Sequence, residues 1–271
     1  MRARRPVLGV VAPLAALLVA ALLPVSTSTA APATATPASA AISRVPTAAA
    51  SARTAAVTVY APRIPTVTRW RVPVRVRQVI VVRATSWSTT HATVSLYSRT
   101  TGAWHRVASW PARIGYTGMV VGTRRVQDSG KTPAGVYGIT ETFGRLGNPG
   151  TRMAYTKVTT NHWWVEDRRS AYYNQMRLGT QGGFALRTNG FNASERLGSM
   201  GAQYDYAAVI NFNRPKPVIG RGAGIFLHAY GSGATAGCVS IRHDHMRAVL
   251  RWLNPAAYPR IVIGTVAYLA P

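Results

Sequence analysis

The only cysteine of the chain, Cys238, lies ten positions after His228, and most residues between them are glycine or have small side chains. A cysteine thiol becomes a strong nucleophile when a nearby base or positive field removes its proton, and a histidine across a short loop supplies such a base. Gly237 leaves the thiol without a neighbouring side chain, so that an acyl group can approach the backbone there. The spacing therefore indicates a Cys/His nucleophilic site.

The elements that would carry this site follow from the hydrophobic pattern. An apolar run at residues 225–227 predicts a strand that ends at His228. Apolar residues at 246, 249, 250 and 253 have the spacing of one helical face and predict a helix that ends before Pro255. Short strands are expected over residues 79–82, 93–98, 104–108, 204–212 and 260–264. The predicted fold class is mainly β (α+β), with one late helix after the cysteine loop.

The first 30 residues have the three parts of a secretory signal peptide. Residues 1–5 are basic, residues 7–23 are almost entirely apolar, and Ser28-Thr29-Ala30 is a small-residue cleavage site. The alternative is an uncleaved anchor, although the apolar stretch is shorter than the ~20 residues that span a bilayer. No later segment is apolar enough, so we expect a secreted, extracellular chain without a stable transmembrane span after cleavage.

The remaining sequence divides into a linker and a domain. Residues 31–65 are mostly alanine, threonine, serine and proline without a hydrophobic period, which predicts a disordered linker. Residues 66–271 are expected to form a single folded domain, with N-terminal strands over 66–112 and the catalytic core over 113–268. Arginines at 69, 71, 75 and 77 alternate with mostly apolar residues, which predicts an edge strand whose arginine face either is solvated or binds anions.

The chain is strongly basic. It has 32 lysine and arginine residues and a formal net charge of +25 at pH 7, which falls to +22 if residues 1–30, with three arginines and no acid, are removed. Such a charge favours anionic surroundings. For an exported protein we expect anionic cell-wall polymers or a membrane surface as possible partners, and no nucleic acid.

The lone cysteine cannot form a disulfide within the chain. In an exported protein, a single thiol either reacts or is a small buried apolar group. Its histidine neighbour at loop spacing favours the first interpretation.

Three other motifs suggest chemistry at first sight. Gly130-Lys131-Thr132 resembles part of a phosphate-binding loop, but Arg125 stands where that motif requires glycine. Glu166-Asp167 favours a polar turn over an acid/base pair or metal ligands, because neighbours in a strand point to opposite sides. The histidines of His243-Asp244-His245 would diverge in a helix and lack a second cysteine at a usual spacing. We therefore expect no metal and no cofactor.

Four motifs together resemble the L,D-transpeptidase (YkuD-like) family, and their order and spacing match an exported actinobacterial branch of it. They are Gly130-Lys131-Thr132-Pro133-Ala134-Gly135, Tyr172-Tyr173-Asn174, Ile225-Phe226-Leu227-His228 and Thr235-Ala236-Gly237-Cys238-Val239-Ser240-Ile241. The resemblance spans roughly residues 75–265, and the cysteine loop is its most specific part.

The resemblance implies a β-rich catalytic domain, for which we expect a β-sandwich-like arrangement, and an activity on peptidoglycan stem peptides. In this family a cysteine attacks the tetrapeptide stem between its third residue, a diamino acid, and the terminal D-alanine. The resulting thioester passes its acyl group to the side-chain amine of a second stem. Members of the family are typically blocked by carbapenems.

Carried over by position, the resemblance makes Cys238 the nucleophile and His228 the residue that takes its proton. The carbonyl of Ala229 would orient the histidine, and the N–H groups of Gly237 and Cys238 would form the oxyanion hole. Backbone donors of that kind contribute about 3–4 kcal/mol to transition-state stabilisation.

The chain departs from the family pattern beside the nucleophile. The family commonly has Ser-His-Gly-Cys-Ile/Val-Arg-Met, whereas Ala236 stands here for the histidine and Ser240 for the arginine. The spacing from histidine to cysteine is also shorter than in most members, and Arg242 is a candidate to replace the lost arginine. The expected substrate-binding residues are Tyr230, Thr235, Ser240 and Arg242.

The sequence thus favours an exported cysteine acyltransferase, an L,D-transpeptidase associated with the cell wall and acting on peptidoglycan stem peptides. One alternative is an L,D-carboxypeptidase of the same fold, which would use water as the acceptor. The other is a non-catalytic basic protein that binds the cell wall, and the Cys/His pair argues against it because binding needs no nucleophile.

Overall fold

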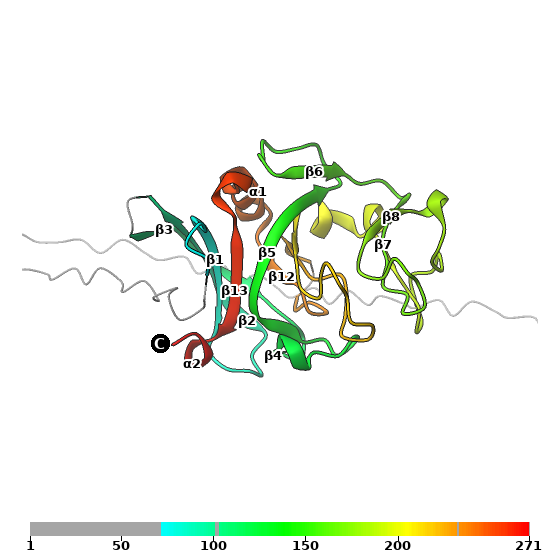
Figure 1. The fold of residues 1–271 in the computed structure, drawn as a ribbon, viewed down its shortest axis with the longest axis horizontal. Helices are drawn as coiled ribbons and strands as arrows, with labels where there is room; N and C mark the ends of the chain where they lie inside the picture. Colours follow the sequence, from blue (N-terminus) through cyan, green and yellow to red (C-terminus); the bar gives the residue numbers. More distant parts are fainter. Residues whose placement is uncertain (1–71, 101–102, 232, 271) are drawn as a thin grey trace, which may run out of the picture. The chain divides into compact units, whose positions relative to one another are not determined.

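The computed structural model describes residues 72–100, 103–231 and 233–270, whose arrangement is shown in Figure 1. The predicted signal peptide, the linker and the start of the arginine-rich segment lie outside these residues. Within the described ranges, no helix combines the length and the apolar character needed to cross a membrane.

Ten strands form one sheet, and this sheet closes on itself. Strand β5 (Thr132–Gly144) pairs with β13 through its first half and with β10 through its second half, so both sides of the strand are occupied. Around the closed sheet the order is β10 (Ala207–Ile210), β11 (Phe226–Ala229), β12 (Val239–Ile241), β3 (Trp104–Arg113), β2 (His91–Arg99), β1 (Gln78–Ala84), β13 (Arg260–Thr265) and β5. The short strands β4 (Met119–Val121) and β6 (Ala154–Lys157) pair in parallel with the first and the last residues of β5.

The fold is therefore a closed barrel, and the expected sandwich-like arrangement is wrong. A sandwich keeps two separate sheets, each with its own edges. Here the 13-residue strand β5 is long enough to continue from one partner to the next, and a register shift in its pairing with β10 accompanies the change.

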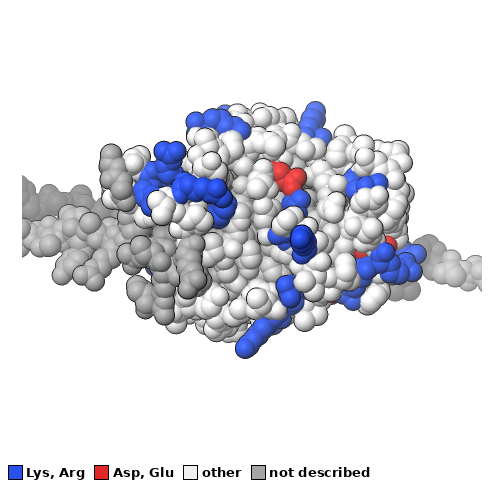
Figure 2. All heavy atoms as spheres, viewed as in Figure 1, with Lys and Arg blue, Asp and Glu red and all other residues white. Residues whose placement is uncertain are grey.

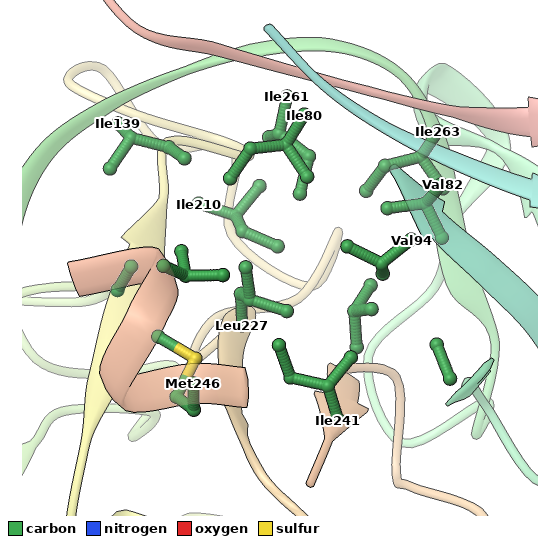
Figure 3. Close-up of a cluster of buried hydrophobic side chains, with 14 of the residues drawn as sticks. Ile80, Val82, Val94, Ile139, Ile210, Leu227, Ile241, Met246, Ile261 and Ile263 are labelled. Atoms are coloured by element: carbon green, nitrogen blue, oxygen red, sulfur yellow. The ribbon is translucent and has the colours of Figure 1, made fainter. Parts of the chain in front are cut away.

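Alternating side chains fill the interior of this barrel. Ile80 and Val82 of β1 lie in register with Ile261 and Ile263 of the parallel strand β13, and all four side chains are buried. They join the core cluster that also contains Leu227 and Ile241 from the strands on either side of the cysteine loop (Figure 3). The core thus fixes the strands that carry the site.

The late helix is confirmed as α1 (His243–Trp252), which packs on β10 and β11. Met246, Val249 and Leu250 are its buried residues and belong to the barrel core. A second short helix, α2 (Val266–Leu269), follows β13.

Most predicted strands are confirmed, with two exceptions. Strands β1, β2, β3 and β13 contain the residues predicted for them. The apolar run at 204–212 is shorter as a strand: a 3₁₀-helix ends at residue 204, a bend occupies 205–206, and only β10 is extended. The described part of the arginine-rich segment contains a turn at residues 74–75, closed by the Val76 N–H donating to the Pro73 carbonyl at 2.9 Å. The alternating pattern therefore does not continue as an edge strand there.

A smaller sheet lies beside the barrel and forms the other side of the site. It consists of β7 (His162–Trp164) between β8 (Met176–Leu178) and β9 (Glu195–Arg196). An aromatic cluster that includes Trp164, Phe226 and Tyr204 joins it to β11, and Cys238 belongs to the same cluster. Along β11 the two-residue period sends Leu227 into the barrel core and Phe226 into this cluster.

Candidate active site

The Cys238 thiol lies immediately before β12 and is held by backbone groups of the neighbouring segment. Its Sγ accepts a hydrogen bond from the Phe226 N–H and donates one to the Gly224 carbonyl, both at 3.3 Å. Only 7% of Cys238 is exposed. The nucleophile predicted from the sequence therefore has one defined position against the start of β11.

Two threonine hydroxyls hold the carbonyl of the same cysteine. Thr235 Oγ1 donates to the Cys238 carbonyl at 2.6 Å, and Thr132 Oγ1 donates to it at 3.3 Å. Thr132 comes from the Gly-Lys-Thr-Pro motif at the start of β5 and is completely buried. The backbone that carries the thiol is thus fixed from its own loop and from a distant strand.

His228 lies on β11, in register with Ser240 of the neighbouring strand β12. Its Nδ1 and the Ala229 carbonyl are 2.6 Å apart, so Nδ1 carries the proton and donates it to that carbonyl. Nε2 is then the nitrogen that can accept a proton. The predicted orienting role of Ala229 is compatible with this contact.

Burial makes His228 a weak base at rest. It lowers the pKa of His228 to about 4, against the opposing effect of the Ala229 and Gln203 carbonyls. The ring also packs edge-on against Tyr204, with centroids 5.3 Å apart. The imidazole is therefore neutral at pH 7.

Two cavities meet at Cys238. One has a volume of about 220 Å³ and is bordered by His228, Tyr204 and the loop residues from Gly233 to Ala236. The other has a volume of about 170 Å³ and is bordered by Arg125 and Glu166, among others. Cys238, Ala236 and Glu195 border both cavities. A substrate could therefore approach the thiol from either side.

Burial is the main reason why the thiol stays protonated at rest. Burial raises the pKa of the Cys238 thiol well above its ordinary value, Glu195 and Glu166 raise it further, and Arg125 opposes them. Burial also raises the pKa of Glu195 to about 7, although a hydrogen bond from the Tyr204 hydroxyl at 2.7 Å lowers it. A neutral thiol next to a neutral imidazole is the resting state that these directions give at pH 7.

The predicted oxyanion-hole donors differ in availability. The Gly237 N–H donates to Thr235 Oγ1 at 3.2 Å, and this hydrogen bond closes a turn within the cysteine loop. Thr235 also borders the larger cavity. An oxyanion at Gly237 would have to compete with this contact, whereas the Cys238 N–H has no hydrogen-bond partner among the described residues.

The other residues predicted to bind substrate lie away from the two cavities that meet at the thiol. Tyr230 donates from its hydroxyl to the Pro111 carbonyl at 2.9 Å. Ser240 is completely buried, and its hydroxyl has no hydrogen-bond partner in the described part of the chain. Arg242 is exposed and forms an ion pair with Asp244 at 3.1 Å. None of these three residues borders either cavity.

The Tyr-Tyr-Asn motif holds the segment before β11 by hydrogen bonds. The Asn174 side chain accepts from Trp164 Nε1 at 3.0 Å and from the Gly224 N–H at 3.2 Å. Gly224 is the residue whose carbonyl accepts from the thiol. Tyr173 accepts from the Gly222 N–H at 3.1 Å, so both motif residues fix the segment that faces Cys238.

Sequence reasoning missed three charged residues of the site, namely Arg125, Glu166 and Glu195. The Glu166-Asp167 pair was interpreted as a polar turn, which fits Asp167, whose carboxylate accepts from the Ala185 N–H at 3.1 Å. Glu166 instead reaches the smaller cavity. Among the described residues, no group of three or more His, Cys, Asp and Glu side chains is placed to hold a metal ion.

The match to known proteins covers the barrel and the cysteine loop. The L,D-transpeptidase catalytic domain family, YkuD, matches residues 78–263. Among solved structures, Bd1075 of Bdellovibrio bacteriovorus is 18% identical with a TM-score of 0.36, and the alignment covers 70% of this chain and 48% of that one. The helical cell shape determining protein Pgp2 from Campylobacter jejuni is 14% identical with a TM-score of 0.35 and the same coverages.

The chain spans about half the length of those two proteins. A comparison with curated proteins gave no match. The family match alone extends over well more than half of the sequence and includes both His228 and Cys238. The chain therefore belongs to the YkuD family of L,D-transpeptidase catalytic domains.

Proposed function

We propose that this protein is an exported cysteine acyltransferase of peptidoglycan, an L,D-transpeptidase that uses Cys238 as its nucleophile. The observation that carries the proposal is that Cys238 and His228 border one cavity while the Ala229 carbonyl fixes the histidine tautomer. A thiol and a proton acceptor that share a cavity are what thioester formation requires.

In the proposed first half-reaction, His228 Nε2 takes the thiol proton as Sγ attacks the carbonyl of the diamino acid in a tetrapeptide stem. The bond from that carbonyl to the D-alanine nitrogen breaks, and His228 returns the proton to the departing amine. In the second half-reaction the amine of another stem attacks the thioester, loses a proton, and releases the Cys238 thiol. Atoms and protons balance over the two steps.

The electrostatics of the site suit a concerted transfer. Burial opposes both the thiolate and the imidazolium, so a stable ion pair is not the resting state. The proton would move as the sulfur–carbon bond forms, when negative charge appears on the substrate oxygen near the Cys238 N–H. In a site with a preformed thiolate, by contrast, the proton leaves the thiol before the substrate binds.

Acylation by a carbapenem, followed by intact mass measurement, tests the nucleophile. The wild-type protein should gain the mass of one inhibitor, and Cys238→Ala should gain none. An unmodified wild type, or an equal adduct on Cys238→Ala, would exclude the proposed chemistry.

Purified tetrapeptide stems distinguish the transpeptidase from the carboxypeptidase. A transpeptidase gives cross-linked dimers and D-alanine when the acceptor amine is free, whereas a carboxypeptidase gives D-alanine and tripeptide with no dimer. Tripeptide alone, at every acceptor concentration, would replace the first proposal by the second.

The basic surface supports binding to the cell wall in addition to the enzymatic activity. Figure 2 shows lysine and arginine side chains in several separate groups on one face, with few acids between them. Such a surface attracts anionic polymer. Binding to isolated cell walls by Cys238→Ala at low salt, lost at high salt, would show that adhesion is independent of the thiol.

We also propose that the protein is secreted, remains at the cell wall and belongs to the exported actinobacterial branch. Support comes from the leader-like residues 1–30 and from the Thr-Ala-Gly-Cys-Val-Ser form of the cysteine loop. The N-terminal sequence of the protein recovered from the culture medium and the cell-wall fraction tests cleavage near Ala30. Recovery of the chain from the cytoplasm alone, with Met1 intact, would contradict export.

A further inference from the structure

Arg125 is a buried guanidinium beside the nucleophile. Only 5% of the residue is exposed, and it borders the 170 Å³ cavity together with Cys238. Its Nε donates to the Lys131 carbonyl at 2.8 Å, and its Nη1 donates to the Arg221 carbonyl at 3.2 Å. These neutral carbonyls orient the side chain but supply no negative charge. A buried cation without an anion is costly.

Two glycines make room for the guanidinium. A Cβ on Gly222 would lie 1.5 Å from Arg125 Nη1, and a Cβ on Gly237 would lie 2.8 Å from Nη2. Both glycines have positive φ, +115° and +140°, which other residues rarely adopt. The missing side chain of Gly237, beside Cys238, therefore leaves room for Arg125.

The guanidinium has no ion-pair partner among the described residues. The acids that border its cavity are Asp128, Glu166 and Glu195. Asp128 pairs with Arg168. Burial raises the pKa of both glutamates, which favours their neutral forms. Nη2 donates no hydrogen bond to these acids or to any other described residue.

We propose that Arg125 binds the terminal carboxylate of the acyl donor, one residue beyond the carbonyl that Cys238 attacks. The inference rests on the proposed function and names a specificity-determining residue for it. In a tetrapeptide stem, only an amide nitrogen and one Cα separate that carboxylate from the scissile carbonyl carbon. Arg125 and Cys238 border the same cavity, so the guanidinium can bind the carboxylate while the thiol attacks the carbonyl. Arginine binds carboxylates through charge-assisted hydrogen bonds.

The residues around the cysteine leave this role open for Arg125. Ser240, which stands where the family commonly has arginine, is completely buried. Arg242 is exposed and paired with Asp244. The cation at this thiol therefore comes from the segment between β4 and β5 and not from the cysteine loop.

The test compares a purified tetrapeptide stem with the same peptide amidated at its terminal carboxyl. The side-chain amine of both peptides is acetylated so that neither serves as acceptor, and Cys238 acylation by each is followed by intact mass. The wild type should react roughly ten- to a hundredfold faster with the free acid. Arg125→Gln should abolish the preference, so that the acid and the amide react at the same rate. Arg125→Lys should retain part of the preference, because it keeps the charge but loses the planar fork.

Arg124→Gln is the matched control, since it removes an exposed arginine from the same turn. Alkylation by iodoacetamide, which is uncharged, reports on the thiol and its surroundings in each variant. Loss of the acid preference in Arg125→Gln, with its retention in Arg124→Gln, supports the inference, and the alkylation rate corrects each variant for any change in the thiol itself.

Equal rates with acid and amide in the wild type would overturn the inference and leave the proposed function standing. Acylation by neither peptide would overturn both. A parallel loss of iodoacetamide reactivity in Arg125→Gln, with the acid preference retained, would show that Arg125 acts on the thiol and not on the carboxylate.

Discussion

Thr132 and Cys238 are 106 positions apart in the sequence, yet the Thr132 hydroxyl donates a hydrogen bond to the Cys238 carbonyl at 3.3 Å. Thr132 Oγ1 also accepts a hydrogen bond from the Gly115 N–H at 2.8 Å. One buried hydroxyl thus joins the first residue of β5, the turn before β4 and the nucleophile. The position of the thiol depends on a strand that contributes no reacting group.

Thr132→Val should destabilise the protein and slow acylation of Cys238. Valine has the same shape but leaves the Gly115 N–H without its acceptor, and an unsatisfied buried group costs about 1–3 kcal/mol. Urea unfolding measures the loss of stability, and the rate of carbapenem adduct formation measures the effect on the thiol. Thr132→Ser keeps the hydroxyl and should retain most of both properties. Identical unfolding of Thr132→Val and wild type would contradict the role given to this contact.

Gly237→Ala should impair the site far more than an alanine at an unconstrained glycine. The new Cβ would lie 2.8 Å from Arg125 Nη2 and 3.0 Å from the Lys131 carbonyl, at a φ of +140°. We expect a loss of stability on the order of 1–3 kcal/mol and a strong loss of acylation. Gly147→Ala is the control, because a Cβ there meets nothing within 4 Å. Similar behaviour of the two variants would show that the space at Gly237 is not needed.

The sequence predicted the local parts of this fold and missed its closure. Hydrophobic period is a local signal, and it identified α1 and the strands at residues 79–82 and 260–264 correctly. Barrel closure depends on β5 pairing with both β13 and β10, and such long-range pairing leaves no mark in either segment. The alternation of arginines resembled a strand but carried no information on the turn between Pro73 and Val76.

The candidate site shows the same division. Cys238 and His228 are recognisable because their residue types and their loop spacing already suggest nucleophilic chemistry. Arg125 is one of many arginines in the chain and lies in a short turn. It matters only because Gly222 and Gly237 lack side chains that would occupy the position of its guanidinium. The pairing of β9 with Trp164 of β7 places Glu195 at the two cavities that Cys238 borders. Neither residue belongs to a motif, so composition and spacing could not single them out.

The acylation rate of the wild type should persist to unusually low pH. His228 must be neutral to take the thiol proton, and burial lowers its pKa to about 4. The rate should therefore fall as the pH falls towards about 4, whereas an ordinary histidine would lose its function near pH 6.5. A pH–rate profile of carbapenem acylation, with circular dichroism at each pH as a check of folding, measures this. A decline centred near 6.5 in a folded protein would contradict the assignment.

His228→Ala should lose acylation at neutral pH and recover part of it as the pH rises. Without the imidazole, the reaction depends on the fraction of free thiolate. A free thiol has a pKa of about 8.5, but burial raises that of Cys238, so recovery should require a pH above this value. The intact mass of the adduct at each pH reports the outcome. Normal acylation of His228→Ala at pH 7 would require another base.

Glu195→Gln should stabilise the protein at high pH and not at low pH. Burial raises the pKa of Glu195 from 4.5 to about 7, so the folded state binds more protons than the unfolded state between these values. The free energy of unfolding therefore falls as the pH rises through this range, by up to about 3 kcal/mol. Glutamine does not ionise, and its amide oxygen can still accept from the Tyr204 hydroxyl.

Urea unfolding of wild type and Glu195→Gln at pH 4 and pH 8 measures the difference. The contribution of His228 has the opposite sign, because a base with a lowered pKa loses stability as the pH falls from about 6.5 to about 4, but it is present in both proteins and cancels. The advantage of the variant should be near zero at pH 4 and largest at pH 8. An equal difference at both pH values would mean that Glu195 ionises in the folded protein as readily as in water, and burial would then not raise its pKa.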